Sequence, residues 1–447
     1  MSVLTYAEAL GLLEQALSFG INPSLDGIRT LTTALGVPQD AFRSMQVTGT
    51  NGKTSVTRIA AALLSAHGQR TGAYTSPHLV AYTERFVVDG TSVDEDEFAA
   101  AIVAVMSAVE DTIAHHAETL GLGTDAMDLA YTEFELLTAA ALRLFRERGC
   151  MWACLEVGMG GRWDATSVVS PEVAVITGVG LDHTDRLGAT REEIAADKAH
   201  IIKPGSVAVL GPGCQGVEDI LLRRVTETDA RVVRVGLGDQ DVAWRVTVVP
   251  DRPGGEMRMD VYGVHAVYDG LSVTAPSYQA PNVATAVAAV EVALGRALEP
   301  DTVRAALAGL SFPGRFELLS EAPAVVIDGA HNHQAAQALA SAIVEAFGHR
   351  SPIAVLGVLR DKDAEGIVRA LAPAVSAFVC TRNESPRSLS PEELAGVVER
   401  VTGKPVVTGD SVESALEIAL GKAADAQTGV VVTGSLYTAG LARALLG

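Results

Sequence analysis

"VTGTNGKTSVTRIA", residues 47–60, decides the fold of this chain, because it has the form of a phosphate-binding loop that opens a helix. The common nucleotide-triphosphate loop, GxxxxGK[ST], separates its two glycines by four residues, so that backbone N–H groups can surround the phosphates. Here only two residues separate Gly49 from Gly52, and Val47 stands where the first glycine would fall. Two interpretations follow: a phosphate loop of another kind, or an ordinary glycine turn before an exposed Lys53.

The sequence around this loop favours phosphate binding. An apolar stretch at 42–48 precedes it and a helical pattern at 54–68 follows, which is the strand, loop and helix order that such a loop requires. A helix N-terminus supplies free N–H groups to an anion, and glycines let the backbone come close to it. Lys53 could reach the outer phosphates, while Thr54 and Ser55 offer hydroxyl groups.

The rest of the chain repeats the same layering. Apolar strand patterns alternate with small-residue turns and helical patterns, which predicts an α/β fold with a largely parallel sheet. From about 231 to 275 short alternating segments with Pro, Gly and Asp turns predict a small antiparallel insertion. We expect an N-terminal ATP-binding, P-loop ATPase-like domain over 1–297 and a C-terminal Rossmann-like α/β domain over 298–447, with the boundary somewhere in 297–312.

Composition limits the classes of function. The chain has 447 residues, 48% of them hydrophobic and 20% charged, and a formal charge of −20, which disfavours nucleic acid and anionic membranes as partners. The most apolar stretch, 99–109, is shorter than the ~20 residues that cross a bilayer. The N-terminus lacks the features of a secretory signal, so we expect a cytoplasmic protein. Four scattered cysteines without a CxxC pair predict buried free thiols.

Ionisable residues follow two predicted strands of the N-terminal half. Glu156 ends the apolar run 151–157, and His183 lies in "LDHTDRLG" just after the run 172–179. Ligands of open α/β sheets bind outside the carboxyl ends of the strands, so a metal or a substrate would be met there. Taken alone, His183 is more typical of a hydrogen-bonded structural histidine. Lys198, in "ADKAHIIKPG", would by itself be read as an ion-paired or snorkelling lysine.

Ten stretches resemble the motifs of one family, the folylpolyglutamate synthase and dihydrofolate synthase ligases of the Mur ligase superfamily. They run in family order from residue 48 to 440: "TGTNGKTS", "TSPHL", "ERF", "EVGMGGRWDATSVV", "LDHTDRLG", "DKAHIIKPG", "FPGRFE", "DGAHN", "DKD" and "TGSLYTAG". The family's phosphate loop is the short form GTNGK followed by a small residue, which accounts for the spacing of Gly49 and Gly52. The resemblance therefore covers nearly the whole chain.

The resemblance implies an ATP-dependent ligase that joins L-glutamate to a folate-type carboxylate, on dihydropteroate or a reduced folate, through an acyl phosphate. ATP and Mg²⁺ are the implied cofactors, with two Mg²⁺ sites. The implied partners are small-molecule substrates, without nucleic acid or membrane, and relatives suggest a monomer. Both folylpolyglutamate synthase and dihydrofolate synthase activity are expected.

Carried over by motif, the resemblance also implies roles for individual residues. The ATP ligands are Gly49, Thr50, Asn51, Gly52, Lys53, Thr54 and Ser55 in the loop, with Asn282, Arg315 and Asp328 from the interdomain side. The Mg²⁺ ligands are Ser76, Glu156, His183 and Lys198, and Lys198 matches a lysine that is carbamylated to become an anionic ligand. The catalytic candidates are Lys53, Lys198, His331 and Ser435, and the last two match positions associated with the incoming glutamate.

The chain departs from the family pattern in a few places. Asp197 and His200 replace residues of the usual "EKAG" around the carbamylated lysine, and Tyr278 replaces the histidine of the usual "HQ". The pterin-side surface matches more loosely, through 21–31, 131–141 and the segment from Arg162 to Asp164, and no single residue there is assigned.

Two alternatives stay open. Family members usually have glycine after GTNGK, whereas this chain has Thr54, as Mur ligases do. A Mur-type peptidoglycan ligase is therefore one alternative. Those enzymes carry a further N-terminal domain for a UDP-sugar, for which the 48 residues before Gly49 are too few. The other is a P-loop ATPase without ligase chemistry, which gives no reason for a second α/β domain with "DGAHN" and "TGSLY".

Overall fold

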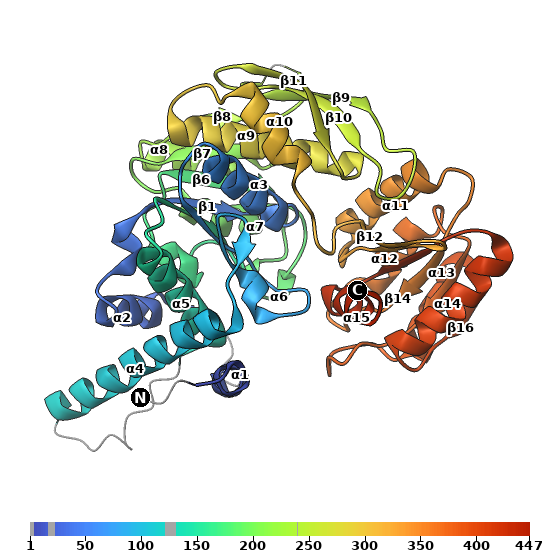
Figure 1. Ribbon diagram of the computed structural model, residues 1–447, viewed down its shortest axis with the longest axis horizontal. Helices are drawn as coiled ribbons and strands as arrows, with labels where there is room; N and C mark the ends of the chain where they lie inside the picture. Colours follow the sequence, from blue (N-terminus) through green and yellow to red (C-terminus); the bar gives the residue numbers. More distant parts are fainter. Residues whose placement is uncertain (1–3, 17–22, 121–130, 239) are drawn as a thin grey trace.

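A computed structural model describes residues 4–16, 23–120, 131–238 and 240–447, with two α/β units side by side (Figure 1). The N-terminal unit is built on an eight-stranded sheet in the order β4-β3-β2-β5-β1-β6-β7-β8. Strands β2, β5, β1, β6, β7 and β8 are parallel, and β3 and β4 add an antiparallel edge. The strands are β1 Arg43–Thr48, β2 Thr71–Tyr74, β3 Phe86–Val88, β4 Thr91–Ser92, β5 Trp152–Glu156, β6 Val173–Gly178, β7 Val207–Gly213 and β8 Arg231–Arg234.

Helices cover both faces of this sheet, because its central strands are apolar on both sides. One face packs on α3 and α9, and the other on α2, α4 and α5 at one end and on α7 and α8 at the other. The helices of this unit are α1 Tyr6–Ala16, α2 Asp26–Ala34, α3 Lys53–Ala66, α4 Glu95–Leu120, α5 Glu133–Glu147, α6 Thr184–Leu187, α7 Arg191–Lys198, α8 Glu218–Glu227, α9 Ala280–Leu294 and α10 Pro300–Ala308. Short 3₁₀ helices are η2 Pro38–Ala41, η3 Tyr82–Arg85, η5 Ala165–Val168, η6 Ala199–Ile201 and η7 Ser277–Gln279.

The predicted antiparallel insertion is present but begins later than expected. It is a three-stranded sheet in the order β11-β10-β9, with β9 Ala243–Val248, β10 Met257–Tyr262 and β11 Val267–Val273, packed over α9. Placing its start at 231 was wrong, because β8 pairs in parallel with β7 and so extends the main sheet. The sequence "RVVR" of β8 is short, carries a charge at each end and is only partly buried, so it lacks the continuously apolar pattern of the central strands.

Helix α10 belongs with the N-terminal unit by its packing. It lies on α3 and β11, and its Val303 and Leu307 join the same core as α3 and α9. We therefore propose that the boundary between the units lies after α10, nearer the end of the interval 297–312 than at 298.

The C-terminal unit, orange to red in Figure 1, is a six-stranded sheet in the order β12-β13-β17-β14-β15-β16. All its strands are parallel except the edge strand β12, which sequence reasoning missed. Helices α11, α12 and α13 cover one face and α14 and α15 the other. The strands are β12 Glu317–Glu321, β13 Ala324–Ile327, β14 Ile353–Leu356, β15 Ala377–Cys380, β16 Val406–Thr408 and β17 Val430–Thr433, and the helices are α11 His333–Phe347, α12 Ala364–Leu371, α13 Pro391–Thr402, α14 Val412–Ala426 and α15 Leu436–Leu446.

The predicted α/β class of both units is confirmed by this architecture. The four cysteines are buried, as predicted. In the part of the chain that the structure describes, no helix is long and apolar enough to cross a membrane.

Candidate active site

The loop between β1 and α3 has the backbone geometry of an anion cradle, and its two glycines are required. Gly49 has φ 155°, and a Cβ there would lie 1.9 Å from the hydroxyl oxygen of Thr177. Gly52 has φ 87°, and a Cβ there would lie 2.5 Å from the side-chain oxygen of Asn282. The Thr177 hydroxyl donates to the carbonyl oxygen of Asn51 over 2.6 Å and so pins the loop to the end of β6. No side chain caps α3, so its first N–H groups are free for phosphate.

Two lysines point their ammonium groups at this loop. Lys53 donates to the carbonyl oxygens of Gly49 and Thr50 over 3.0 and 3.3 Å, and Lys198 donates to the carbonyl oxygen of Gly49 over 3.0 Å. Lys198 is 4% exposed. Burial and then the charge of Lys53 lower the pKa of Lys198 to about 7, and burial also lowers the pKa of Lys53. The loop therefore has a positive environment although the chain is strongly acidic.

Glu156, at the end of β5, is the carboxylate that faces these cations. It is 1% exposed, and it accepts from the Thr54 hydroxyl over 2.8 Å and from the Ser76 backbone N–H over 3.1 Å. Burial raises the pKa of Glu156, while the charge of Lys53 and the bond from Thr54 oppose that rise. Thr54, the residue that departs from the family's usual glycine, thus orients the Glu156 carboxylate.

Residues from the junction of the two units close another side of the site. Asp328, which follows β13, accepts from the backbone N–H groups of Phe316 and Ala330 over 2.9 and 2.8 Å and from the Tyr278 hydroxyl over 2.8 Å. Burial raises the pKa of Asp328, and the charge of Arg315 opposes this. Tyr278, in place of the family's usual histidine, is therefore a hydrogen-bond donor to a site carboxylate.

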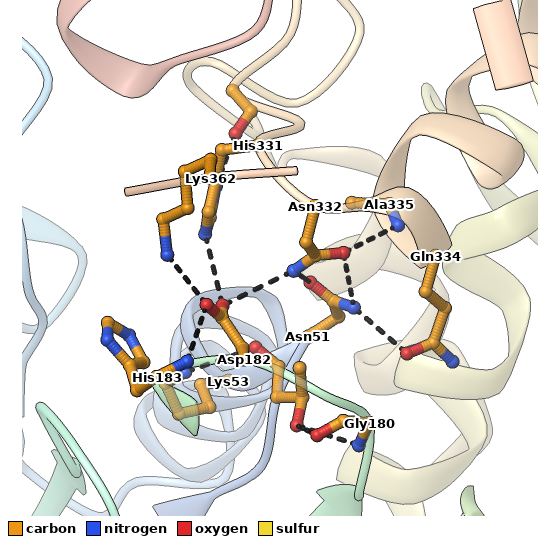
Figure 2. A network of polar contacts seen from close by, with 12 residues as sticks. Asn51, Lys53, Gly180, Asp182, His183, His331, Asn332, Gln334, Ala335 and Lys362 are labelled. Carbon is orange, nitrogen blue, oxygen red and sulfur yellow. Dashed lines mark hydrogen bonds and ion pairs between the residues drawn. The ribbon is translucent and has the colours of Figure 1, made fainter. Parts of the chain in front are cut away.

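The C-terminal unit reaches over the loop through a polar network around Asp182 (Figure 2). The Asp182 carboxylate accepts from the Lys362 ammonium over 2.6 Å and from the Asn332 amide over 3.4 Å, and His331 Nε2 lies 3.6 Å away. The Asn332 amide also donates to the side-chain oxygen of Asn51 in the loop over 3.1 Å. Burial alone would raise the pKa of Asp182, but the contacts from His331 and Lys362 hold it well below its ordinary value.

The two predicted histidines face this same region, whereas Ser435 does not. His183 precedes α6 with φ 51°, and its side chain lines the site cavity. His331 Nδ1 is 2.8 Å from the carbonyl oxygen of Gly329, which leaves Nε2 toward Asp182. Ser435 is 2% exposed and accepts from the Tyr437 N–H, so that it caps α15.

A single cavity of about 590 Å³ brings these groups together. Every residue predicted for ATP, Mg²⁺ or catalysis lines it except Ser435, whose neighbour Leu436 does. The stretch from Arg162 to Asp164, predicted for the pterin side, is not among its lining residues. Residues 21 and 22 of the stretch 21–31, also predicted for that side, lie outside the described residues.

In the polar network around Asp182, four of the side chains had no role assigned from the sequence: Asp182, Asn332, Gln334 and Lys362. Asp182, Asn332 and Lys362 lie inside motifs that carried the resemblance, "LDHTDRLG", "DGAHN" and "DKD", so those motifs were the available signal. Their pairing depends on how the units meet, which spacing along the chain does not give.

The donor set around Glu156 fits Mg²⁺ bound together with nucleotide. Among the residues that the structure describes, no three His, Cys, Asp or Glu side chains gather as a metal site on their own. Mg²⁺ usually takes one or two carboxylates and completes its shell with substrate phosphates and water. A buried Glu156 beside the hydroxyl of Thr54 and a phosphate-binding loop meets that requirement.

Comparisons with known proteins agree with this geometry. Residues 97–290 match the family model "Mur ligase middle domain", and residues 314–436 match "Mur ligase, glutamate ligase domain". A Mycobacterium tuberculosis protein named dihydrofolate synthase/folylpolyglutamate synthase is 38% identical over 96% of this chain and 91% of its own length.

Solved structures extend the comparison to three dimensions. The M. tuberculosis folylpolyglutamate synthase complexed with ADP and AMPPCP is 37% identical, with a TM-score of 0.90 over 99% of both chains. The bifunctional folylpolyglutamate synthase/dihydrofolate synthase of Yersinia pestis, complexed with AMPPNP and a Mn ion, is 29% identical, with a TM-score of 0.80 over 99% of this chain and 98% of that one. Both units and the arrangement between them are therefore shared with nucleotide-bound proteins.

Proposed function

This chain belongs to the folylpolyglutamate synthase/dihydrofolate synthase family of the Mur ligase superfamily, and we propose that it is an ATP-dependent ligase that joins L-glutamate to a folate-type carboxylate. The observation that carries the proposal is the cavity in which the phosphate loop and Glu156 of one unit meet Arg315, Asp328 and His331 of the other. A P-loop ATPase alone would not need the second unit. The relatives' names favour a folate substrate over the UDP-sugar of a peptidoglycan ligase.

Amide formation needs ATP because a carboxylate at neutral pH is a poor electrophile. A carboxylate oxygen of the folate-type substrate attacks the γ-phosphorus, ADP leaves, and an acyl phosphate results. The amine of glutamate then attacks the acyl carbon, inorganic phosphate leaves, and the nitrogen loses a proton. In both steps the enzyme acts mainly by positioning and by neutralising charge.

The loop residues of this chain are suited to the first step. The N–H groups at the start of α3 and the Lys53 ammonium would hold the β- and γ-phosphates, with Asn282, Arg315 and Asp328 on the nucleotide from the interdomain side. Glu156 is buried and Lys53 is partly buried, so the Lys53 charge would act more strongly on the phosphates, and the Glu156 charge on a bound Mg²⁺, than either would in solvent.

Ser76, Glu156 and His183 would hold one Mg²⁺, which neutralises phosphate charge when it is bound. Lys198 would serve a second Mg²⁺ after carbamylation, in which its neutral amine adds to CO₂ and releases one proton. Two features favour that reaction: Lys198 is buried, and its pKa is lowered to about 7, so that much of the amine is neutral at neutral pH. The carbamate would also remove the repulsion between Lys198 and Lys53.

The C-terminal unit would receive the glutamate. His331 lines the cavity and is the better-supported of the two predicted glutamate residues. Ser435 is buried as a helix cap, so a role for it would pass through the position of α15. We further propose that the enzyme adds glutamate both to dihydropteroate and to reduced folates, and that it acts as a cytoplasmic monomer.

Measurement of ADP release tests this function. We expect ADP release that requires both L-glutamate and either dihydropteroate or a tetrahydrofolate, assayed side by side, with a product heavier by one glutamyl residue in mass spectrometry. ADP release that is indifferent to both co-substrates would refute the ligase. Turnover supported instead by a UDP-muramoyl substrate would favour the peptidoglycan alternative, and size-exclusion chromatography with light scattering checks the monomer.

A further inference from the structure

Asp182 is the point at which the C-terminal unit is tied to the N-terminal unit above the phosphate loop (Figure 2). Its side chain is 9% exposed and that of its partner Lys362 is 11% exposed, so the two opposite charges meet largely away from solvent. One carboxylate oxygen accepts from Lys362 over 2.6 Å, and the other lies 3.6 Å from His331 Nε2. Asp182 therefore contacts both the Lys362 ammonium and the His331 imidazole, which the C-terminal unit brings to this side of the site.

The acidic neighbours of Lys362 have other partners. Asp361 lies 3.4 Å from the guanidinium of Arg387, and Asp363 accepts from the Gly366 N–H at the start of α12. The charge of Lys362 is thus met by Asp182, which lies in the other unit. A charge-assisted hydrogen bond between largely buried groups has a defined geometry, so it fixes where the ammonium sits.

A second set of contacts holds the same C-terminal segment to the loop without Asp182. The side chain of Asn51 exchanges hydrogen bonds with Asn332 over 3.1 and 3.4 Å and donates to Gln334 over 3.2 Å. These contacts are between uncharged amides and lie at the start of α11 (Figure 2). Loss of Asp182 would therefore leave these hydrogen bonds between the start of α11 and the phosphate loop in place.

We propose that Asp182 is a positioning residue that fixes the Lys362 ammonium and the His331 imidazole over the phosphate loop, and so sets where the incoming amino acid meets the activated carboxylate. It acts through these two residues, and nucleotide binding does not depend on it. The expected change in the kinetics of glutamate addition rests on the proposed ligase function. The tie between the units can be measured without turnover.

The variant Asp182→Asn removes the charge and keeps the shape of the side chain. Its remaining oxygen can still accept from the His183 N–H, which is 2.9 Å from the present carboxylate, so the local turn is retained. Asp185→Asn is the matched control, because Asp185 lies in the same segment, is exposed, and pairs with the exposed Arg186 over 3.4 Å. Asp182→Glu tests whether a carboxylate restores function.

We expect Asp182→Asn to raise the KM for glutamate at least ~10-fold, the size expected when one partner of a buried, hydrogen-bonded charge pair is removed. The Kd of AMPPNP and the Mg²⁺ dependence of its binding should stay within about threefold of wild type. Asp182→Glu should recover part of the loss, and Lys362→Gln should reproduce it with little further effect in the double variant. An unchanged glutamate KM, or an equal loss of AMPPNP affinity, would overturn the proposal.

Hydrogen–deuterium exchange with AMPPNP bound supplies the readout that needs no turnover. We expect Asp182→Asn to speed amide exchange in residues 359–364 and 329–331 but not in residues 49–56, with no such change in Asp185→Asn. If wild type fails the ligase assay while this exchange pattern appears, the proposed ligase function is wrong and the proposed role of Asp182 in holding the two units together is supported. If wild type is a ligase and Asp182→Asn leaves amide exchange unchanged, the proposed role of Asp182 in holding the two units together is wrong. Should Asp182→Asn fail to fold, Lys362→Gln gives the same comparison.

Discussion

The ammonium groups of Lys53 and Lys198 donate to one atom, the carbonyl oxygen of Gly49, each over 3.0 Å. When both ammonium groups are protonated they repel each other at this one carbonyl, and together they add positive potential at the phosphate loop. The ammonium group of Lys53 is local positive charge through which a chain with a formal charge of −20 can attract a polyanion such as ATP. The same repulsion favours deprotonation of Lys198, because the charge of Lys53 adds to the effect of burial and lowers the pKa of Lys198 to about 7.

Lys53→Ala should abolish turnover while the protein stays folded. The side chain donates only to loop carbonyl oxygens, which solvent can reach once it is removed, whereas the γ-phosphate loses a preorganised cation. Removal of such a donor typically lowers kcat by ~10²–10³. ADP release and thermal unfolding measure the two parts of this prediction. Lys404→Ala is the control, because Lys404 donates to Val375 outside the cavity; retained activity in Lys53→Ala would refute the loop assignment.

The activity should depend on CO₂, with a pH dependence set by Lys198. Burial, then the charge of Lys53, lowers its pKa to about 7, so the reactive neutral amine increases as the pH rises through that value. After CO₂ is removed, activity should return on its addition, more fully at pH 8 than at pH 6 for the same concentration of dissolved CO₂. Lys198→Arg should be inactive and unresponsive. Wild-type activity that ignores CO₂ at both pH values would contradict carbamylation.

Thr54 should be required for metal-dependent activity through Glu156. Its hydroxyl donates to the carboxylate over 2.8 Å, and a hydrogen bond to a charged group contributes ~1.5–3 kcal/mol, or roughly 10- to 100-fold. Thr54→Gly, which creates the residue usual in the family, should raise the Mg²⁺ concentration for half-maximal ADP release by at least ~10-fold. Thr54→Ser keeps the hydroxyl and should stay close to wild type. Equal behaviour of the two variants would show that Thr54 does not act through Glu156.

The sequence predicted the parts of this molecule that are encoded locally. Strands β5 and β6 are almost continuously apolar because helices cover both their faces, and their carboxyl ends therefore indicated the region of Glu156 and His183. The role of His183 came from the family resemblance, since taken alone it is more typical of a structural histidine. The phosphate loop was predictable because its two glycines are dictated by backbone geometry. Edge strand β12 was missed, since its residues are only partly buried and carry a weak pattern.

Contacts between the units were beyond the reach of sequence patterns. Asp182 and Lys362 are 180 positions apart, and their ion pair exists only because two separate sheets present their carboxyl ends to each other. Ser435 shows a limit of motif matching. Its motif matched a position associated with the incoming glutamate, whereas in this structure its hydroxyl caps α15. A motif therefore located the region of each residue, and the packing of the units determined what the side chain contacts.

Gly49→Ala should destabilise the protein and prevent nucleotide binding, because the new methyl group has no room. Its Cβ would lie 1.9 Å from the Thr177 hydroxyl and 3.2 Å from the carbonyl oxygen of Gly178. Overpacking of this kind costs ~1–3 kcal/mol, which urea unfolding can measure. Gly68→Ala is the control: Gly68 also has positive φ, 76°, but an added Cβ meets nothing within 4 Å. Gly68→Ala should thus lose only the ~1–2 kcal/mol of a left-handed backbone and keep its affinity for AMPPNP.

A double variant separates the clash from other effects at Gly49. Thr177→Ala removes the nearest atom but also the 2.6 Å hydrogen bond that holds the Asn51 carbonyl. Combined with Gly49→Ala, it should recover part of the stability, because the contact with Gly178 remains, while AMPPNP binding stays weak. Full recovery of binding in the double variant would mean that the Thr177 hydroxyl alone makes glycine necessary at this position. Normal binding by Gly49→Ala itself would mean that the loop approaches phosphate in another geometry.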